Sequence, residues 1–284
     1  MKQELLQMIM PAFGNVKNLK LFITLIVKCI KKILGTQKRG KPRLDLTKVI
    51  SGIIYYLKTG CQWRCLPTIF GNWRSLYGWY ARFSELEIFR MIWEKLIRYS
   101  DEKGFLEMQN LLGDGSLILT TSSISQKAKN PRMKNKNCLN RLILTDKKGF
   151  PISLILSTGV ANDTKFLIPL LDKAKKLVNF PEKYTVHADK GFDSMSNRLE
   201  IIQRGGFAEI PVRNMGYRVP YPKTKDSKRP IIEHTFAWIN AFKSLKTIST
   251  KKLSNLYENS YLAFSLIQSR LFKTIDFKRL IKDA

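Results

Sequence analysis

Apolar residues recur at helical spacing through the first third of the chain. Within residues 44–58 they lie at positions 46, 49, 50, 53, 54 and 57. Intervals of three and four residues place them on one face, so this stretch is predicted to be an amphipathic helix. A second helix is predicted over residues 87–104, where Gly104 ends it.

After about residue 105 the pattern changes to short apolar runs that alternate with helical segments. The runs predicted as strands are LLGDGSLIL (111–119), the two arms of RLILTDKKGFPISLIL (141–156), YTVHADKG (184–191) and FAEIPVR (207–213). The predicted helices are 162–178, 194–206 and 231–245. The order β-β-β-α-β-α-β-α predicts an α/β domain with a largely parallel core sheet.

This change divides the 284 residues into two predicted domains, 1–105 and 106–284. The first is expected to be helical and to bind DNA. The second is expected to carry the chemistry. Residues 127–141 contain Lys and Arg but no acid, and Asn and Pro lie between them, so a flexible, positively charged loop is predicted there.

Charge is the outlying property of the composition. The chain has 50 Lys plus Arg against 22 Asp plus Glu, a formal net charge of +28. Such an excess predicts a polyanionic partner, and nucleic acid is the first candidate. An anionic membrane surface and a merely solvated basic surface are the alternatives.

One apolar segment, Leu19–Leu34, is a candidate for a membrane span. It is shorter than the roughly 20 apolar residues that a span requires, and Lys28, Lys31 and Lys32 interrupt it. No small-residue cleavage site follows it, which disfavours a signal peptide. We therefore expect an amphipathic or buried helix, no membrane association and a cytoplasmic, nucleoid-associated protein.

Cysteines and aromatic residues have ordinary explanations. Cys29, Cys61, Cys65 and Cys138 form no CxxC pair, so free thiols are favoured over a zinc site. Trp63, Trp73 and Trp79 alternate with arginines and could contact DNA. Because aromatic residues at helical spacing more often pack in the core, we expect these three to be core residues.

Three acidic residues stand out in so basic a chain: Asp114 inside the first predicted strand, Asp189 at the end of the fourth, and Glu233 on the last helix. Functional groups of open α/β sheets collect at the carboxyl ends of strands. Oxygen ligands suit Mg²⁺ or Mn²⁺, and two such ions can support phosphoryl transfer. Each acid also has a structural explanation, as a turn residue for Asp114 and Asp189 and as a first-turn helix acid for Glu233. Asp193 is the better candidate for a helix cap.

Several blocks together resemble bacterial insertion-sequence transposases of the DDE type, in the group that includes insertion sequences four and five. They are GDGS, TDKKGFPISLILSTGVANDTKFLIPLL, VHADKGFDS, IPVRN and KRPIIEHTFAWINAFKSL, preceded by CQWRCLPTIFGNWRSLYGWYARF. The resemblance covers about residues 44–270. It implies an RNase H-like catalytic domain, a mixed sheet flanked by helices, behind a helical N-terminal domain. It places Asp114, Asp189 and Glu233 on the metal-binding triad.

The resemblance also implies a reaction. Water cuts the element end with the help of Mg²⁺ or Mn²⁺, two ions in all, and the freed 3′-hydroxyl attacks target DNA. Lys190 and Arg229 are expected to neutralise phosphate charge, unless they are general basic surface. The implied partners are the terminal inverted repeats and the target DNA, bound by a homodimer.

This sequence departs from the family pattern near the last acid. The family places a tyrosine three residues before the arginine and a lysine seven after the glutamate, where this chain has Asp226 and Asn240. Lys243 is one possible replacement for the lysine. Two alternatives therefore stay open: an inactive, DNA-binding copy, and a two-metal nuclease of the same fold without strand transfer.

Overall fold

The computed structural model describes residues 16–35, 44–212 and 229–283. They form two compact units, one from Met1–Leu96 together with Ile239–Ala284, the other from Ile97–Trp238. Each unit is described by itself below. None of the described helices is long and apolar enough to cross a membrane.

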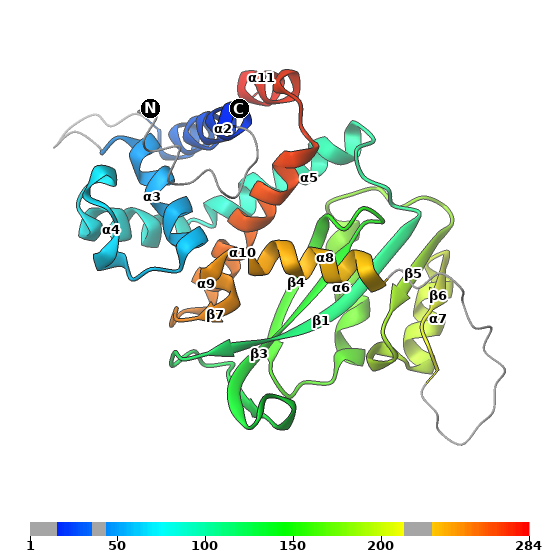
Figure 1. The fold of residues 1–284 in the computed structure, drawn as a ribbon. Coiled ribbons are helices and arrows are strands. Elements are labelled where there is room, and N and C mark those ends of the chain that lie inside the picture. Colours follow the sequence, from blue (N-terminus) through cyan, green and yellow to red (C-terminus); the bar gives the residue numbers. More distant parts are fainter. Residues whose placement is uncertain (1–15, 36–43, 213–228, 284) are drawn as a thin grey trace. The chain divides into compact units, whose positions relative to one another are not determined.

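The first unit is helical (Figure 1). Its elements are α2 (Val16–Leu34), α3 (Leu46–Thr59), the 3₁₀ turns η2 (Trp63–Cys65) and η3 (Thr68–Phe70), α4 (Trp73–Glu85), most of α5 (Ile88–Glu102), α9 (Lys243–Lys246), the two-residue β7 (Thr247–Ile248), α10 (Leu253–Gln268), η7 (Ser269–Leu271) and α11 (Thr274–Lys282). The two helices predicted over 44–58 and 87–104 are confirmed. The Asp45 side chain caps the first by accepting from Thr47 N, and Gly60 ends it with φ 64°.

Helices from both ends of the chain build this unit. Asn18 of α2 donates from Nδ2 to the carbonyl oxygen of Phe272 at 3.3 Å, and Lys28 Nζ donates to the carbonyl oxygen of Lys282 at 3.3 Å. On α4, Ser84 Oγ donates to Asn255 Oδ1 of α10 at 2.7 Å. The predicted division into 1–105 and 106–284 assigns the C-terminal helices to the second domain, whereas here they pack with the N-terminal helices. Whether 1–105 and 106–284 fold as separate domains stays a prediction.

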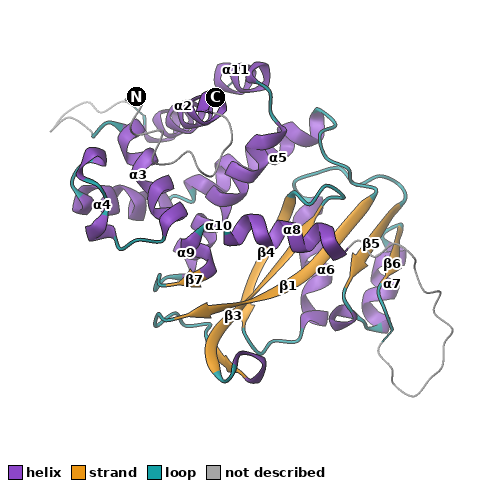
Figure 2. Cartoon of the chain, in the orientation of Figure 1, coloured by secondary structure: helices purple, strands orange, loops and turns teal. Residues whose placement is uncertain are grey.

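The second unit is a mixed sheet with helices on both faces (Figure 2). Its strands are β1 (Asn110–Thr120), β2 (Ala128–Asn130), β3 (Lys136–Thr145), β4 (Pro151–Thr158), β5 (Tyr184–Ala188) and β6 (Gly206–Glu209). The other elements are η4 (Pro131–Met133), η5 (Asp163–Phe166), α6 (Leu167–Lys175), η6 (Lys190–Phe192), α7 (Met195–Gln203) and α8 (Arg229–Asn240) up to Trp238.

Strand order gives the sheet its RNase H-like character. The neighbours run β2-β3-β1-β5-β6, and β4 also pairs with β3. β1 is antiparallel to β3 and parallel to β5, and β5 is parallel to β6. The expectation of a largely parallel sheet was wrong, because the tight turn at residues 146–149 makes β3 and β4 a hairpin and β1 pairs antiparallel with β3. The mixed sheet implied by the family resemblance is correct.

The basic segment 127–141 is more ordered than the predicted loop. β2 pairs with the start of β3 there, and η4 lies between the two strands. Asn130 supports this turn by accepting from Arg132 N at 2.8 Å. Asn side chains that accept from nearby backbone N–H groups stabilise turns, so a polar stretch can form an ordered turn without an apolar pattern.

Candidate active site on the sheet of the second unit

Asp114 lies in the middle of β1 and is half-buried. Its Oδ1 accepts from the backbone N–H of Gly115 at 2.7 Å, and across the ladder it faces Ile143 of β3. β1 continues before and after Asp114 and so fixes the backbone position of this residue. Asp114 is therefore a strand residue and not part of a turn at Asp-Gly.

Asp189 follows directly after β5 and is also half-buried. Its Oδ1 accepts from the N–H of Lys190 at 2.7 Å and so caps the short turn η6. The last paired residues of the parallel strands β1 and β5 are Gly113 and Ala188, and the two aspartates are the next residue on each strand. Because neighbouring strands lie about 4.8 Å apart, the register brings the backbones of the two aspartates close together.

Alternation along β1 shows which face of the sheet carries these acids. Gly113 and Gly115 turn toward the opposite face, where an added Cβ would lie 3.2 Å from Leu167 of α6 and 3.1 Å from the Asn140 side chain. Successive side chains of a strand point to opposite faces. Asp114 therefore points away from α6 and toward the face on which α8 packs.

Glu233 lies in the second turn of α8 and is exposed. The helix is attached to the sheet by Thr235, whose Oγ1 donates to the carbonyl oxygen of Gly149 at 2.7 Å, and by the Phe236 ring, which lies 5.7 Å from the guanidinium carbon of Arg141. All three predicted acids thus lie in the second unit, the aspartates at the sheet and Glu233 on the helix that packs on it. The aspartates are neighbours, but in the described part of the chain no three His, Cys, Asp or Glu side chains are close enough to hold a metal ion.

The two predicted basic residues flank the acids along the chain. Lys190 follows Asp189 directly, is exposed, and begins η6. Arg229 is the first described residue of α8, four positions before Glu233.

Arg141 is a residue of this face that the sequence patterns did not single out. It lies on β3 opposite Ser116, is only 1% exposed, and burial lowers the pKa of its guanidinium to about 9. Asp114 and Ser116 share a face, so Arg141 lies diagonally across from Asp114, at the roughly 7–8 Å of diagonal strand neighbours. The sequence did not predict that Arg141 is buried, because the pattern of β3 does not show that Phe236 of α8 covers this position.

His187 was missed as well, although it lies two residues before Asp189. Its Nε2 lies 2.8 Å from Asn110 Oδ1 of β1, and its Nδ1 lies 3.0 Å from Glu209 Oε2 of β6. The parallel register of β5 and β6 pairs His187 with Glu209. The sequence could have indicated this contact, because His187 and Glu209 occupy corresponding positions in two predicted strands.

Asp193 has a different role from the predicted helix cap. Ser194 caps α7 by accepting from Asn197 N at 3.1 Å, whereas Asp193 pairs with Arg198, whose Nε and Nη2 lie 2.9 and 2.8 Å from Asp193 Oδ1. Arg198 also donates to the carbonyl oxygen of Ile210. Asp193 therefore holds Arg198, the residue that joins α7 to the segment after β6.

Comparisons with known proteins agree with this arrangement. Residues 107–267 match the family described as "Transposase DDE domain", and residues 27–93 match "Putative transposase of IS4/5 family". A protein of Burkholderia cepacia named "Putative transposase for insertion sequence element IS402" is 31% identical over 109 residues, which are 37% of this chain and 50% of that protein. The chain thus matches about half the length of this curated relative.

A solved structure described as "Crystal structure of a pre-cleavage Mos1 transpososome" aligns over 88% of this chain and 82% of its own, with 11% identity and a TM-score of 0.25. A similarity this weak supports no conclusion. The family assignment therefore depends on the two sequence families, the first of which covers more than half of the chain.

Proposed function

Since the chain belongs to the DDE transposases of the IS4/5 type, we propose that it cuts DNA at the ends of its element and joins the freed 3′-hydroxyl to target DNA. Domains of this family generally use divalent metal ions. The observation that carries the proposal for this chain is the position of Asp114 and Asp189, each the first residue after the parallel pairing of β1 with β5 ends.

The donor set fits a hard divalent cation. Asp114 and Asp189 offer carboxylate oxygens from a rigid sheet, and Glu233 offers a third carboxylate from α8 on the same face. Carboxylates are the ligands that Mg²⁺ and Mn²⁺ take in proteins. We propose that Asp114 and Asp189 form the fixed half of the site and that Glu233 completes it when DNA is bound.

Metal ions held there, two in our proposal, would supply Lewis-acid stabilisation of the charge that develops on the transferred phosphate. The chain's own groups orient the substrate. Backbone N–H groups of Gly115 and Lys190 hold the two aspartates at fixed angles. We propose that Lys190 and Arg229 neutralise the non-bridging phosphate oxygens, Arg229 with a planar fork that suits them.

DNA is proposed as the partner because of the net charge of +28. Each element has two ends to cut and join, so we propose that a homodimer assembles on the two inverted repeats. Such a protein would act at the nucleoid, in the cytoplasm.

The test is incubation of the purified chain with duplex DNA that carries its flanking element ends, with Mg²⁺ or Mn²⁺. Cleavage that leaves a 3′-hydroxyl, followed by joined product, supports a transposase. Cleavage that is never followed by joining to a target, whichever DNA is used, supports the nuclease alternative. Asp172→Asn is a matched control, because Asp172 is an exposed carboxylate of the same unit that pairs with Arg204.

A second candidate is favoured by the residues near Glu233. Asp226 and Asn240 stand where the family places a tyrosine and a lysine. A copy that has lost these residues would still fold and bind element ends. Binding of the ends without cleavage under either metal ion would identify the protein as an inactive, DNA-binding transposase copy.

A further inference from the structure

A large cavity lies within the helical first unit, outside the carboxylate site. Its volume is about 620 Å³, within the range of roughly 300–1,000 Å³ that ligand sites occupy. Three chain segments line it: the end of α3 with the residues that follow, α4, and the stretch that leads into α10. The lining residues include Tyr56, Trp63, Arg64, Trp73, Tyr77 and Lys251.

Aromatic rings form the inner wall of this cavity. Trp63 stacks on Tyr56 with centroids 4.2 Å apart and an interplanar angle of 21°, and Tyr80 lies 4.8 Å from Trp63. Tyr56 and Tyr80 are buried, and Tyr80 donates its hydroxyl hydrogen to Asn259 Oδ1 of α10 at 3.0 Å. The wall is therefore rigid, which lowers the entropic cost of binding a planar ligand.

Two further rings lie at the rim instead of in the core. Tyr77 is 44% exposed and Trp73 is 37% exposed, and Tyr77 meets Trp63 edge-on at 5.5 Å. The expectation that Trp73 is a core residue is therefore wrong, and Trp63 and Trp79 are only partly buried. The guanidinium carbon of Arg74 lies 5.3 Å from the centre of the Trp73 ring, and the exposed surface of both rings at the cavity rim is available to a ligand.

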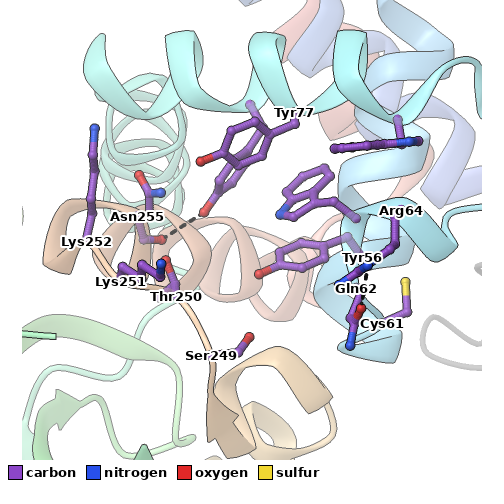
Figure 3. A pocket seen from close by; sticks show the side chains of 13 residues that line it. Tyr56, Cys61, Gln62, Arg64, Tyr77, Ser249, Thr250, Lys251, Lys252 and Asn255 are labelled. Atoms are coloured by element: carbon purple, nitrogen blue, oxygen red, sulfur yellow. Dashed lines mark hydrogen bonds between the residues drawn. The ribbon is translucent and has the colours of Figure 1, made fainter. Parts of the chain in front are cut away.

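The remaining lining residues are polar or positively charged. Arg64, Lys251 and Lys252 are exposed, and Arg64 Nε donates to Gln62 Oε1 at 2.9 Å. None of the described lining residues is acidic. Figure 3 shows Tyr77 and Tyr56 with Lys251, Lys252 and Arg64 around the same space. The cavity thus combines aromatic faces with cations, the combination that proteins use to bind unpaired nucleotides of DNA.

We propose that this cavity binds an unpaired nucleotide of DNA, with its base against Tyr77, Trp73 and Trp63 and its phosphates against Lys251, Lys252 and Arg64. The source of the ligand depends on the proposed function, since DNA cutting and joining expose frayed or single-stranded ends. Base-on-aromatic stacking tolerates every base, so the site accepts an unpaired nucleotide whatever its sequence. It supplies DNA contacts distinct from the carboxylate site of the other unit.

The test compares single-stranded and duplex binding of the full chain. Anisotropy of a fluorescein-labelled oligothymidylate and of a labelled duplex is measured in EDTA, so that the result is independent of metal and of cleavage. Tyr77→Ala is expected to weaken single-strand binding roughly ten-fold, the size of effect seen when a stacking ring is removed, and duplex binding less than two-fold. Trp73→Ala should act in the same direction.

Controls separate stacking from charge and from misfolding. Phe207→Ala removes a ring on β6 that is 60% exposed and lies outside the cavity, and it should change neither affinity. Lys251→Gln with Lys252→Gln should reduce the salt dependence of single-strand binding, by about 0.7 in slope for each phosphate that is no longer neutralised, more than Lys175→Gln with Lys176→Gln at the end of α6. Circular dichroism checks that each variant is folded.

The proposal is overturned if the Tyr77 and Trp73 variants, folded, bind the oligothymidylate as tightly as the parent chain, or if they lose duplex and single-strand affinity equally. Failure of the proposed function gives a different result. A chain that binds the oligothymidylate through Tyr77 but never cuts DNA retains the nucleotide site and loses only the catalytic proposal.

Discussion

Asp114 and Asp189 occupy the first positions beyond the paired residues Gly113 and Ala188 of two neighbouring parallel strands. The carboxylates come from segments 75 residues apart in the sequence, since 189 less 114 is 75. Two negative charges held at strand spacing repel each other unless a cation lies between them. This relationship is the basis of the first prediction.

Asp114→Asn, Asp189→Asn and Glu233→Gln are each expected to abolish strand cleavage, while DNA affinity stays within a few-fold because the binding charges lie elsewhere. Calorimetric titration with Mn²⁺ in the absence of DNA gives an independent readout. There the two Asp variants should lose more affinity than Glu233→Gln, because only the aspartates are already neighbours. If a folded variant cuts DNA at the parent rate, the substituted acid is not a metal ligand.

Asp193→Asn is expected to affect stability rather than chemistry. The Asp193 side chain is 11% exposed and Arg198 is 21% exposed, so the substitution leaves a largely buried guanidinium with a weaker acceptor. We expect a loss of about 1–3 kcal/mol in the free energy of unfolding, measured by urea titration, with cleavage retained in the folded protein. Asp172→Asn, whose ion pair is more exposed, should cost less than about 1 kcal/mol. Loss of cleavage by a fully folded Asp193 variant would place this acid in the active site.

DNA binding should weaken steeply with salt, with a slope of about −0.9 in log K against log salt for each phosphate neutralised. The basic positions of the η4 region are candidates for these interactions; they are Lys127, Lys129, Arg132, Lys134 and Lys136. Replacing them with Gln is expected to flatten the slope. If the slope does not change, the phosphates bind to other surfaces, with the helical unit as the first alternative.

Arg229→Ala is expected to slow cleavage substantially while Mn²⁺ affinity changes little. Arg229 begins α8 four residues before Glu233, and because residues four apart on a regular helix share a face, we expect the arginine to act beside this acid. Unpaired N–H groups at a helix N-terminus attract phosphate too, and the two sources of positive charge coincide. Arg229→Lys should restore only part of the rate, because the planar fork is lost. If the Arg229→Ala variant cleaves DNA at the full rate, Arg229 has no role in cleavage and contributes only to the general positive charge of the surface.

Glu258 predicts a pH dependence of stability. It is 2% exposed on α10, its Oε2 accepts from Phe89 N at 2.8 Å, and burial raises the pKa of its carboxyl to about 8. The folded chain therefore holds a proton that the unfolded chain releases near its ordinary value of 4.5. Stability is expected to fall as pH rises from about 4.5 to about 8, by on the order of a few kcal/mol.

Glu258→Gln keeps a carbonyl acceptor for Phe89 and removes the titration. Its thermal midpoint should be less sensitive to pH across this window and higher than that of the parent chain above it. The exposed Glu85→Gln variant of α4 is the control and should retain the parent's pH dependence. A Glu258→Gln profile that parallels the parent's would show that this carboxyl is not the titrating group.

Local pattern in the sequence was enough to predict most elements of the structure. The stripe over 44–58 predicted α3, and the apolar runs around 146–149 predicted the β3–β4 hairpin. Helical and strand periodicity depends on neighbours within a few residues, so it can be read directly from the chain. The same pattern also predicted the settings in which the structure has Asp114, Asp189 and Glu233: in or directly after a strand for the aspartates, and on the last helix of the sheet unit for the glutamate.

Only the tertiary structure decided which residues meet. Burial of Arg141 under Phe236, the contact of His187 with Glu209, and the grouping of α10 and α11 with the N-terminal helices all join segments that are far apart in the chain. The aromatic cavity is the clearest case, because Trp63, Tyr77 and Lys251 share a site only after three segments pack together. Long-range packing depends on the shapes and volumes of all the surrounding side chains, whereas a linear pattern records only which positions are apolar.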